Sequence, residues 1–164
     1  YPVSTNYNSI GVLYSNAGAT DKAIEFYEKA IEENPHDKHA YANLGSTLLY
    51  KKPKQAKEYL QKALNIDPEH DIALIELGKI DKSEGNTVAA QVKFRKAYDL
   101  YLKQWKTNSL PKYAYGWFAT VAEELGENNF AKEIRASAPK TESEAYYNKE
   151  NLSMTKTKAL TNNN

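Results

Sequence analysis

One residue pattern occurs three times in succession along this chain. In each copy a large residue precedes an apolar residue and a glycine, and two alanines follow on either side of another large residue. The copies read Tyr7, Ile10, Gly11, Tyr14, Ala23, Tyr27, Ala30 and Pro35; Tyr41, Leu44, Gly45, Leu48, Ala56, Leu60, Ala63 and Pro68; and Leu74, Leu77, Gly78, Ala90, Phe94 and Ala97. The three glycines are 34 and 33 residues apart. A fixed period of this length is typical of stacked units that cannot bury their apolar faces alone.

Apolar residues recur at helical spacing along the chain, and the alternation typical of strands is absent. We expect Gly18 to end the first helix, and Asp21 and Asp37 to cap the helices that follow. Pro53 suits the first turn of a helix, where its missing N–H has no partner to lose. The spacing predicts helices over 5–16, 21–33, 69–83 and 87–106, with others opening at 37 and 53.

The small residues of each copy have a packing role in this interpretation. Gly11, Gly45 and Gly78 are expected where the two helices of one pair cross closely, with Ala23, Ala56 and Ala90 facing them. The large residues Tyr27, Leu60 and Phe94 are expected to fill the space between one copy and the next.

The pattern returns in weaker form after the break at 107–111. Arg135 stands where the earlier copies carry a large apolar residue, which predicts that this face ends the stack and meets water. Thr141 and Glu144 have the spacing of a capping box, which predicts a short helix over 142–151. The polar residues from Asn151 onward read as a loosely ordered tail. The weaker copy comprises Tyr115, Phe118, Ala119, Ala122, Gly126, Ala131 and Ala138.

Taken together, the spaced residues resemble those of tetratricopeptide repeat proteins, strongly from Ser4 to Leu102 and weakly beyond. The third copy departs from the family in carrying Asp81 where an aromatic is usual and in lacking the closing proline. The resemblance implies an all-α, right-handed α-solenoid of antiparallel helix pairs, with three clear repeats, a degenerate fourth and a C-terminal capping helix. The expected repeats cover about 4–37, 38–70, 71–106 and 112–139 of a domain at 1–139, followed by a short helix and polar tail at 140–164.

Composition narrows the possible partners. The chain has 164 residues, enough for one domain, and its 22 basic and 21 acidic residues leave a net charge of +1. This balance argues against nucleic acid or an acidic membrane as a partner, and no apolar stretch approaches the roughly 18 residues that span a bilayer. We expect a soluble protein, cytoplasmic by default, with a bacterial envelope or periplasmic location left open. The start at Tyr1, without a Met or a signal sequence, indicates a processed product or a piece of a longer chain.

No pattern of an active site is present in the sequence. His36 and His39 lie close to one helical turn apart, but no third metal ligand accompanies them, and we expect His36 and His70 to be surface turn residues. Cysteine, a Gly-rich phosphate loop and the common hydrolase and metalloprotease motifs are missing. The basic cluster Lys51-Lys52-Pro53-Lys54 is too short to indicate nucleic acid. We therefore expect no enzyme activity and no metal or other cofactor.

The resemblance also implies a concave groove, lined by the first helix of each repeat, that holds a peptide or a partner helix. Asn43 is expected to hydrogen-bond a peptide backbone, and Val12, Ile72, Ile75 and Trp117 are expected to hold apolar side chains. The expected partner is therefore a neutral to partly apolar protein segment. The candidate groove residues are Asn8, Val12, Ala42, Asn43, Ser46, Ile72, Ile75, Glu76, Lys79, Tyr113, Trp117 and Thr120.

One subclass of the family grips the C-terminal carboxylates of heat-shock chaperones. Its clamp uses a Lys and an Asn from the first helix, an Asn from the third, and a Lys and an Arg from the fifth. At these positions the chain has Asn8, Val12, Asn43, Ile72 and Glu76. Only Asn43 matches, and Glu76 places a negative charge where a cation would receive the carboxylate. We expect no binding to chaperone C-terminal carboxylates.

Trp117 has two possible roles. Its neighbours Tyr115 and Phe118 take the packing positions, which leaves the indole on the groove side as an anchor for a partner. Alternatively, the long helix that ends at Trp105 folds against it and caps the stack.

For the whole chain, the leading hypothesis is a non-enzymatic protein–protein interaction module. The alternatives are a self-assembling scaffold, in which Tyr146 and Tyr147 of the tail helix contact another copy, and a helper domain of a larger protein.

Overall fold

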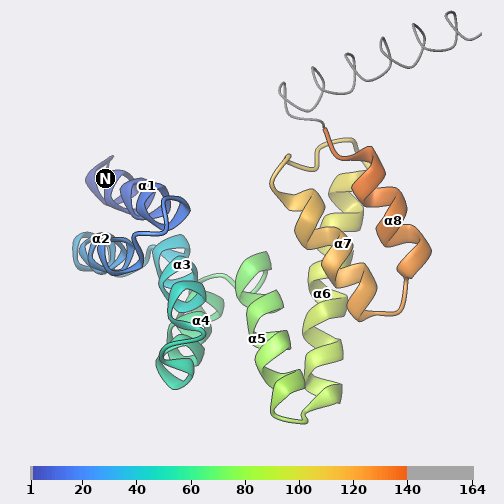
Figure 1. Ribbon diagram of the computed structural model, residues 1–164, viewed down its shortest axis with the longest axis horizontal. Coiled ribbons are helices and arrows are strands. Elements are labelled where there is room, and N and C mark those ends of the chain that lie inside the picture. Colours follow the sequence, from blue (N-terminus) through green and yellow to red (C-terminus); the bar gives the residue numbers. More distant parts are fainter. Residues whose placement is uncertain (1, 140–164) are drawn as a thin grey trace, which may run out of the picture.

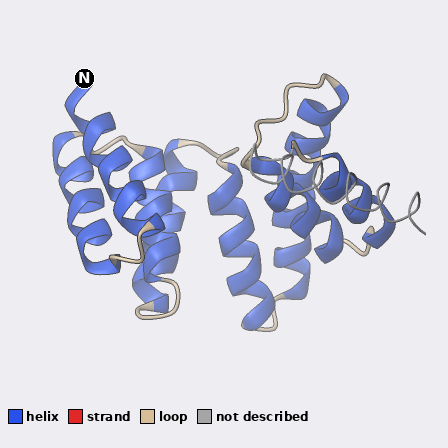
Figure 2. Ribbon diagram, turned by 45° about the horizontal axis from the view of Figure 1, so that its top comes forward, coloured by secondary structure: helices blue, strands red, loops and turns tan. Residues whose placement is uncertain are grey.

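The computed structural model of this chain describes residues 2–139. The expected short helix at 142–151, with Tyr146 and Tyr147, and the polar tail lie outside the described residues. Residues 2–139 form eight α-helices and no strand (Figures 1 and 2). The helices are α1 (Pro2–Asn16), α2 (Thr20–Glu33), α3 (Lys38–Leu48), α4 (Pro53–Ile66), α5 (Asp71–Ser83), α6 (Thr87–Lys106), α7 (Ala114–Glu124) and α8 (Asn128–Ser137).

The helices pack as four successive pairs: α1 with α2, α3 with α4, α5 with α6, and α7 with α8. Neighbouring pairs meet through α2 on α3, α4 on α5, and α6 on α7, while α1, α3 and α5 also contact one another in turn. Figure 1 shows the stack curving into an arc, with α1 and α2 at one end and α7 and α8 at the other. The prediction of an all-α solenoid of helix pairs is confirmed.

Several helix ends follow from local sequence. The Asp37 carboxylate accepts hydrogen bonds from the N–H groups of His39 and Ala40, both at 3.0 Å, and so caps α3. Pro53 is the first residue of α4, as expected. The prediction for Asp21 is wrong, because α2 begins one residue earlier and Asp21 lies within its first turn. There its charge still faces the positive end of the helix dipole.

The glycines mark the closest approach of the two helices in a pair. A Cβ atom at Gly45 would lie 2.7 Å from Leu60 Cγ, and one at Gly78 would lie 2.6 Å from a ring carbon of Phe94. The expectation that alanines face the glycines therefore needs correction. The large side chain four residues further along the second helix fills the space that the missing Cβ leaves, and the Ala56 carbonyl oxygen is a secondary neighbour of Gly45.

The fourth pair closes the core around an aromatic cluster. Phe118 on α7 contacts the rings of Tyr98, Tyr101, Trp105 and Phe130 at centroid distances between 5.5 and 6.0 Å. These rings come from α6, α7 and α8, so they hold the degenerate fourth repeat against the long α6 helix.

The outer face of α8 meets water, as its sequence indicated. Arg135 is exposed and pairs with Glu123, while the neighbouring Ile134 is fully buried. Asp81, where the family usually carries an aromatic, is nearly buried and pairs with Lys93 at 2.5 Å.

Candidate functional site

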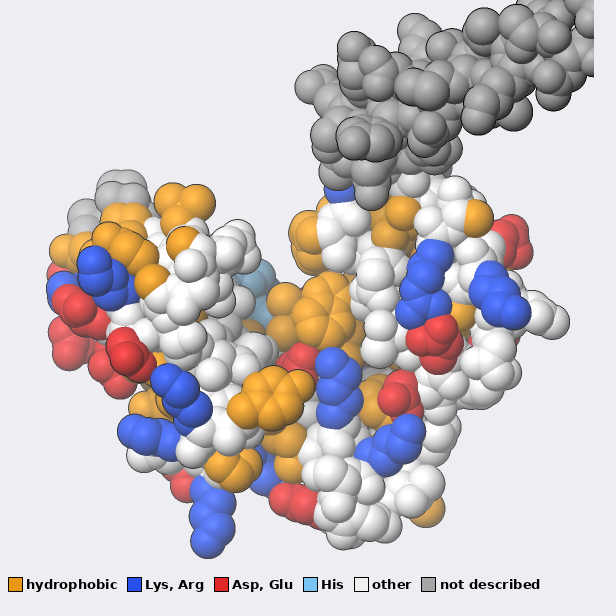
Figure 3. All heavy atoms as spheres, viewed as in Figure 1, with side chains coloured by type: hydrophobic (Ala, Val, Ile, Leu, Met, Phe, Trp, Pro, Cys, Tyr) orange, Lys and Arg blue, Asp and Glu red, His pale blue; other side chains and the backbone are white. Residues whose placement is uncertain are grey.

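The inner side of the arc carries α1, α3, α5 and α7, and the surface is hollowed between the two ends of the stack (Figure 3). Most of the predicted groove residues are partly accessible, and Tyr113 is 66% exposed. The half-buried members are Asn8, Val12, Asn43, Ser46, Ile72, Lys79, Trp117 and Thr120.

Three of the predicted groove residues are buried, so the expectation of an open face is wrong for them. Ala42 and Ile75 have no exposed surface, and Glu76 is only 4% exposed. Ile75 belongs to the core cluster that joins α5, α6, α7 and α8, and Ala42 belongs to the one that joins α3, α4 and α5. Neighbouring helices cover these residues from the side. The helical spacing within one helix does not reveal such contacts.

Asn43 and Asn8 contact each other across the first two repeats. The Asn43 side-chain amide donates a hydrogen bond of 2.9 Å to Asn8 Oδ1. This bond fixes the orientation of both amides and leaves the Asn43 oxygen as an acceptor for another group. The two residues therefore form a neutral hydrogen-bonding element where α1 meets α3.

Glu76, Lys79 and Trp117 form a connected group between α5 and α7. Lys79 Nζ lies 3.1 Å from Glu76 Oε1 and 4.7 Å from the centre of the Trp117 ring. The second carboxylate oxygen, Oε2, is buried with no hydrogen-bond partner among the described residues. Because a buried carboxylate is costly without a nearby cation, Lys79 is held at Glu76 and over the indole face.

Trp105 contacts the other aromatic residues of the fourth pair. Its ring packs against Tyr115, Phe118 and Phe130 at about 6 Å. Trp117 instead stays half-buried beside Lys79 of α5. Trp117 therefore contacts α5 through Lys79, whereas Trp105 of α6 packs on the other aromatic residues of the fourth pair.

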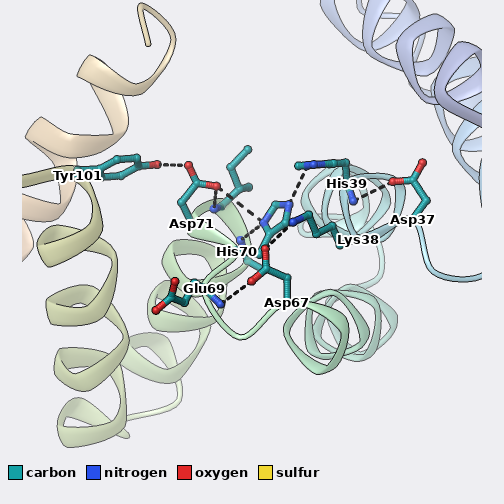
Figure 4. A network of polar contacts seen from close by, with 10 residues as sticks. Asp37, Lys38, His39, Asp67, Glu69, His70, Asp71 and Tyr101 are labelled. Carbon is teal, nitrogen blue, oxygen red and sulfur yellow. Dashed lines mark hydrogen bonds and ion pairs between the residues drawn. The ribbon is translucent and has the colours of Figure 1, made fainter. Parts of the chain in front are cut away.

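A polar network joins the second and third repeats (Figure 4). His70 caps α5, since its Nδ1 accepts from the Ala73 N–H at 3.4 Å. With Nδ1 as the acceptor, the His70 proton is on Nε2, which lies 3.1 Å from His39 Nδ1. The expectation that His70 is a surface residue is wrong: it is 4% exposed, because it closes the turn between two packed repeats.

Burial and hydrogen bonds in this network shift three pKa values. Burial lowers the pKa of His70, and the neighbouring His39 lowers it further. The hydrogen bond from Lys38, at 2.7 Å, lowers the pKa of Asp67. Burial raises the pKa of Tyr101, whose hydroxyl donates to Asp71 at 2.8 Å and ties α6 to the start of α5. The network has the character of a structural joint between repeats, and no group of three metal-ligating side chains gathers within the described residues.

Comparison with known proteins identifies the repeated unit. Sequence profiles of the tetratricopeptide repeat match residues 7–37 and 39–70, which coincide with the α1–α2 and α3–α4 pairs. The first two helix pairs of this chain are tetratricopeptide repeats. These repeats support a role as a protein–protein interaction module. The third and fourth helix pairs continue the same stack.

A curated relative and two solved structures resemble parts of this chain. The bovine BBSome complex member BBS4 is 32% identical over 92 residues, which are 54% of this chain and 17% of that protein. The second TPR of Spaghetti (RPAP3), bound to the HSP90 peptide SRMEEVD, is 20% identical with a TM-score of 0.54, covering 57% of this chain and 88% of that one. The Arabidopsis OM64 TPR domain is 26% identical with a TM-score of 0.56, covering 61% and 84%.

No helix among residues 2–139 is both long and apolar enough to span a membrane.

Sequence reasoning missed contacts between residues of different repeats. The contact of Lys79 with Trp117 and the bond between His39 and His70 each join different repeats. The spacing of Glu76 and Lys79, three residues apart on one helix, was the available signal for an ion pair within α5.

Proposed function

We propose that this chain binds a segment of a partner protein along its concave face, without catalysing a reaction. The observation that carries the proposal is the half-buried indole of Trp117, which faces α5 beneath the Lys79 ammonium group. Large aromatic side chains in partly covered positions supply much of the binding free energy at protein interfaces. Ile72 and Val12, also half-buried, add apolar surface along the same face.

The chemistry of this face favours a neutral to partly apolar segment. Asn8 and Asn43 form a neutral pair on α1 and α3, and Val12 and Ile72 carry no charge. Glu76 holds the nearest cation, Lys79, in an ion pair. We therefore propose that the partner is not the C-terminal carboxylate of a chaperone, since a bidentate anion site needs unengaged cations at several of these positions.

The proposal is tested by capturing partners from a lysate with the chain and with two single variants, Trp117→Ala and Ile72→Lys. Both residues are partly accessible, so the variants are expected to keep their helicity and melting temperature within a few degrees. The matched control is Val88→Lys, which changes a residue that is 80% exposed on α6, away from the concave helices.

The expected result is that one set of captured proteins is lost with both groove variants and retained with Val88→Lys. Direct binding of the captured protein, measured by isothermal titration calorimetry with the same variants, then confirms the site. Retention of every captured protein by Trp117→Ala and Ile72→Lys would refute the proposal. Recovery of only the chain itself, with a multiple of its mass in light scattering, would refute it in favour of self-assembly.

A further inference from the structure

A second accessible hollow lies next to the concave face, between repeats two and three. It is bounded by the α3–α4 turn, the first turn of α4 and the second half of α5, and its volume is about 570 Å³. Leu49, Pro53 and Ile80 form its apolar walls. Tyr50 stands at its edge with 94% of its surface exposed. We call this hollow the turn cleft.

The turn cleft has the size and surface of a binding pocket. Its volume falls in the range of about 300–1,000 Å³ that is usual for ligand sites, and its wall is largely apolar with a few polar groups at the rim. A tyrosine exposed to this degree beside an apolar hollow is unusual, because an aromatic ring gains free energy when it is covered. Figure 3 shows hydrophobic side chains gathered over the junction of α4 and α5, with basic side chains beside them.

The rim of the turn cleft has an excess of positive charge. Lys54, Lys57 and Lys79 all line it. Lys57 pairs with Glu84 at 2.6 Å and Lys79 pairs with Glu76, so these two lysines are compensated.

Two lysines have no such compensation, one on the rim of the turn cleft and one in the adjoining turn. Lys54, and Lys52 in the adjoining turn, make no ion pair with any described residue, while their neighbour Lys51 contacts Asp21 at a loose 3.4 Å. In a chain whose net charge is only +1, this local excess favours an acidic partner.

The turn cleft and the groove at Trp117 share one residue. Lys79 lines the cleft and also covers the Trp117 ring at 4.7 Å. A segment that lies on Trp117 therefore reaches the cleft by passing along Lys79.

We propose that the segment bound on the concave face inserts a large apolar side chain, aromatic for preference, into the turn cleft, and that acidic residues flank this side chain. This inference rests on the proposed function and adds the chemistry of the partner. Tyr50 packs against the inserted side chain, and Lys52 and Lys54 attract the flanking carboxylates.

The test uses the full chain and three short fluorescein-labelled peptides, each with a central Trp between flanks of Glu, Ser or Lys. Fluorescence anisotropy measures their affinity at about 50 mM and about 300 mM salt, because screening separates the charge contribution from the apolar one. We expect the Glu-flanked peptide to bind about tenfold more tightly than the Lys-flanked one at low salt, with a smaller difference at high salt. A Glu-flanked peptide with a central Ala is expected to bind weakly.

Variants assign the binding to the turn cleft. Tyr50→Ala and Lys54→Glu are each expected to weaken the Glu-flanked peptide about fivefold or more, since they remove the apolar cover and reverse one charge. Lys103→Glu is the matched control, because it makes the same charge change on an exposed position of α6. Circular dichroism confirms that each variant is folded.

The outcomes separate this inference from the proposed function. Equal affinity for the three flanks, no measurable binding of the Glu-flanked peptide, or full binding by Tyr50→Ala would each overturn the turn-cleft proposal. The proposed function would then stand or fall on whether Trp117→Ala loses the partner captured from lysate. If that partner itself binds Tyr50→Ala and Lys54→Glu with unchanged affinity, only the turn-cleft proposal fails.

Discussion

Replacing Gly45 with alanine tests how the two helices of the second repeat cross. The added Cβ atom would lie 2.7 Å from Leu60 Cγ and 3.1 Å from the carbonyl oxygen of Ala56. Carbon atoms pack best at about 3.5–4.0 Å, so the neighbours must move by about 1 Å. Both Leu60 and Ala56 are fully buried, and the second contact is with backbone, so neither can turn aside cheaply.

The expected change in the free energy of unfolding is the balance of two effects. Overpacking a core costs about 1–3 kcal/mol, and the upper half of this range applies because a buried side chain and backbone must both shift. Alanine gains about 1 kcal/mol over glycine in helix propensity. Gly45→Ala is therefore expected to destabilise the chain by about 1–2 kcal/mol despite being the better helix former.

Gly116→Ala is the matched control within the same chain. Gly116 is an exposed residue of α7, and a Cβ there would have no neighbour within 4 Å. The helix propensity gain of about 1 kcal/mol then acts alone, so this variant is expected to be more stable than the parent. Urea and thermal unfolding followed by circular dichroism measure both changes, and each kcal/mol corresponds to about 2–4 °C for a chain of this size. If Gly45→Ala is stabilised like Gly116→Ala, the close helix crossing is wrong.

Two further predictions concern buried groups. Because burial lowers the pKa of His70, the unfolded chain binds a proton near pH 6.5 while the folded chain does not. The free energy of unfolding should be constant above this pH and should fall below it by up to about 1.4 kcal/mol per pH unit. The variant His70→Asn, which keeps a cap acceptor, should flatten this dependence. Urea titrations at several pH values measure it. Ile75→Lys should unfold the stack, because it buries a charge at a position with no exposed surface. Ile72→Lys should instead melt within a few degrees of the parent. Equal melting temperatures of the two variants would contradict the burial of Ile75.

The fold was predictable because its determinants are local and repeated. Gly45 recurs with a period that also fixes Leu60 on the partner helix, and Asp37 and Pro53 mark helix starts by their own chemistry. The long helix at 87–106 was predicted with its observed ends, since its apolar stripe runs without a break. The position of His70 was not predictable in this way, because its burial depends on the turn of the preceding repeat.

The groove was predictable only in outline. The helical spacing along α5 predicts that Ile72, Ile75 and Glu76 lie on one face of the helix, and helix geometry alone supports this. It does not show that α6 and α7 cover Ile75 from the side. The burial of a residue in a stack depends on the spacing of the next pair, and that spacing is set by side chains about forty residues away in the chain.

In the chaperone-binding subclass a cation occupies the position that Glu76 holds in this chain. This difference explains where the concave face can recognise charge. A carboxylate at this buried position requires a counter-charge, and Lys79, one turn away, supplies it at 3.1 Å. Lys79 is thereby engaged by the chain itself, and its remaining contact is the face of Trp117. The centre of the groove is left with an aromatic surface and little net charge. Two lysines that make no ion pair with a described residue lie elsewhere: Lys54 lines the turn cleft and Lys52 is in the adjoining turn. The bound segment is therefore expected to place its acidic residues at the α3–α4 turn and its apolar residues on the groove, where Glu76 already engages Lys79.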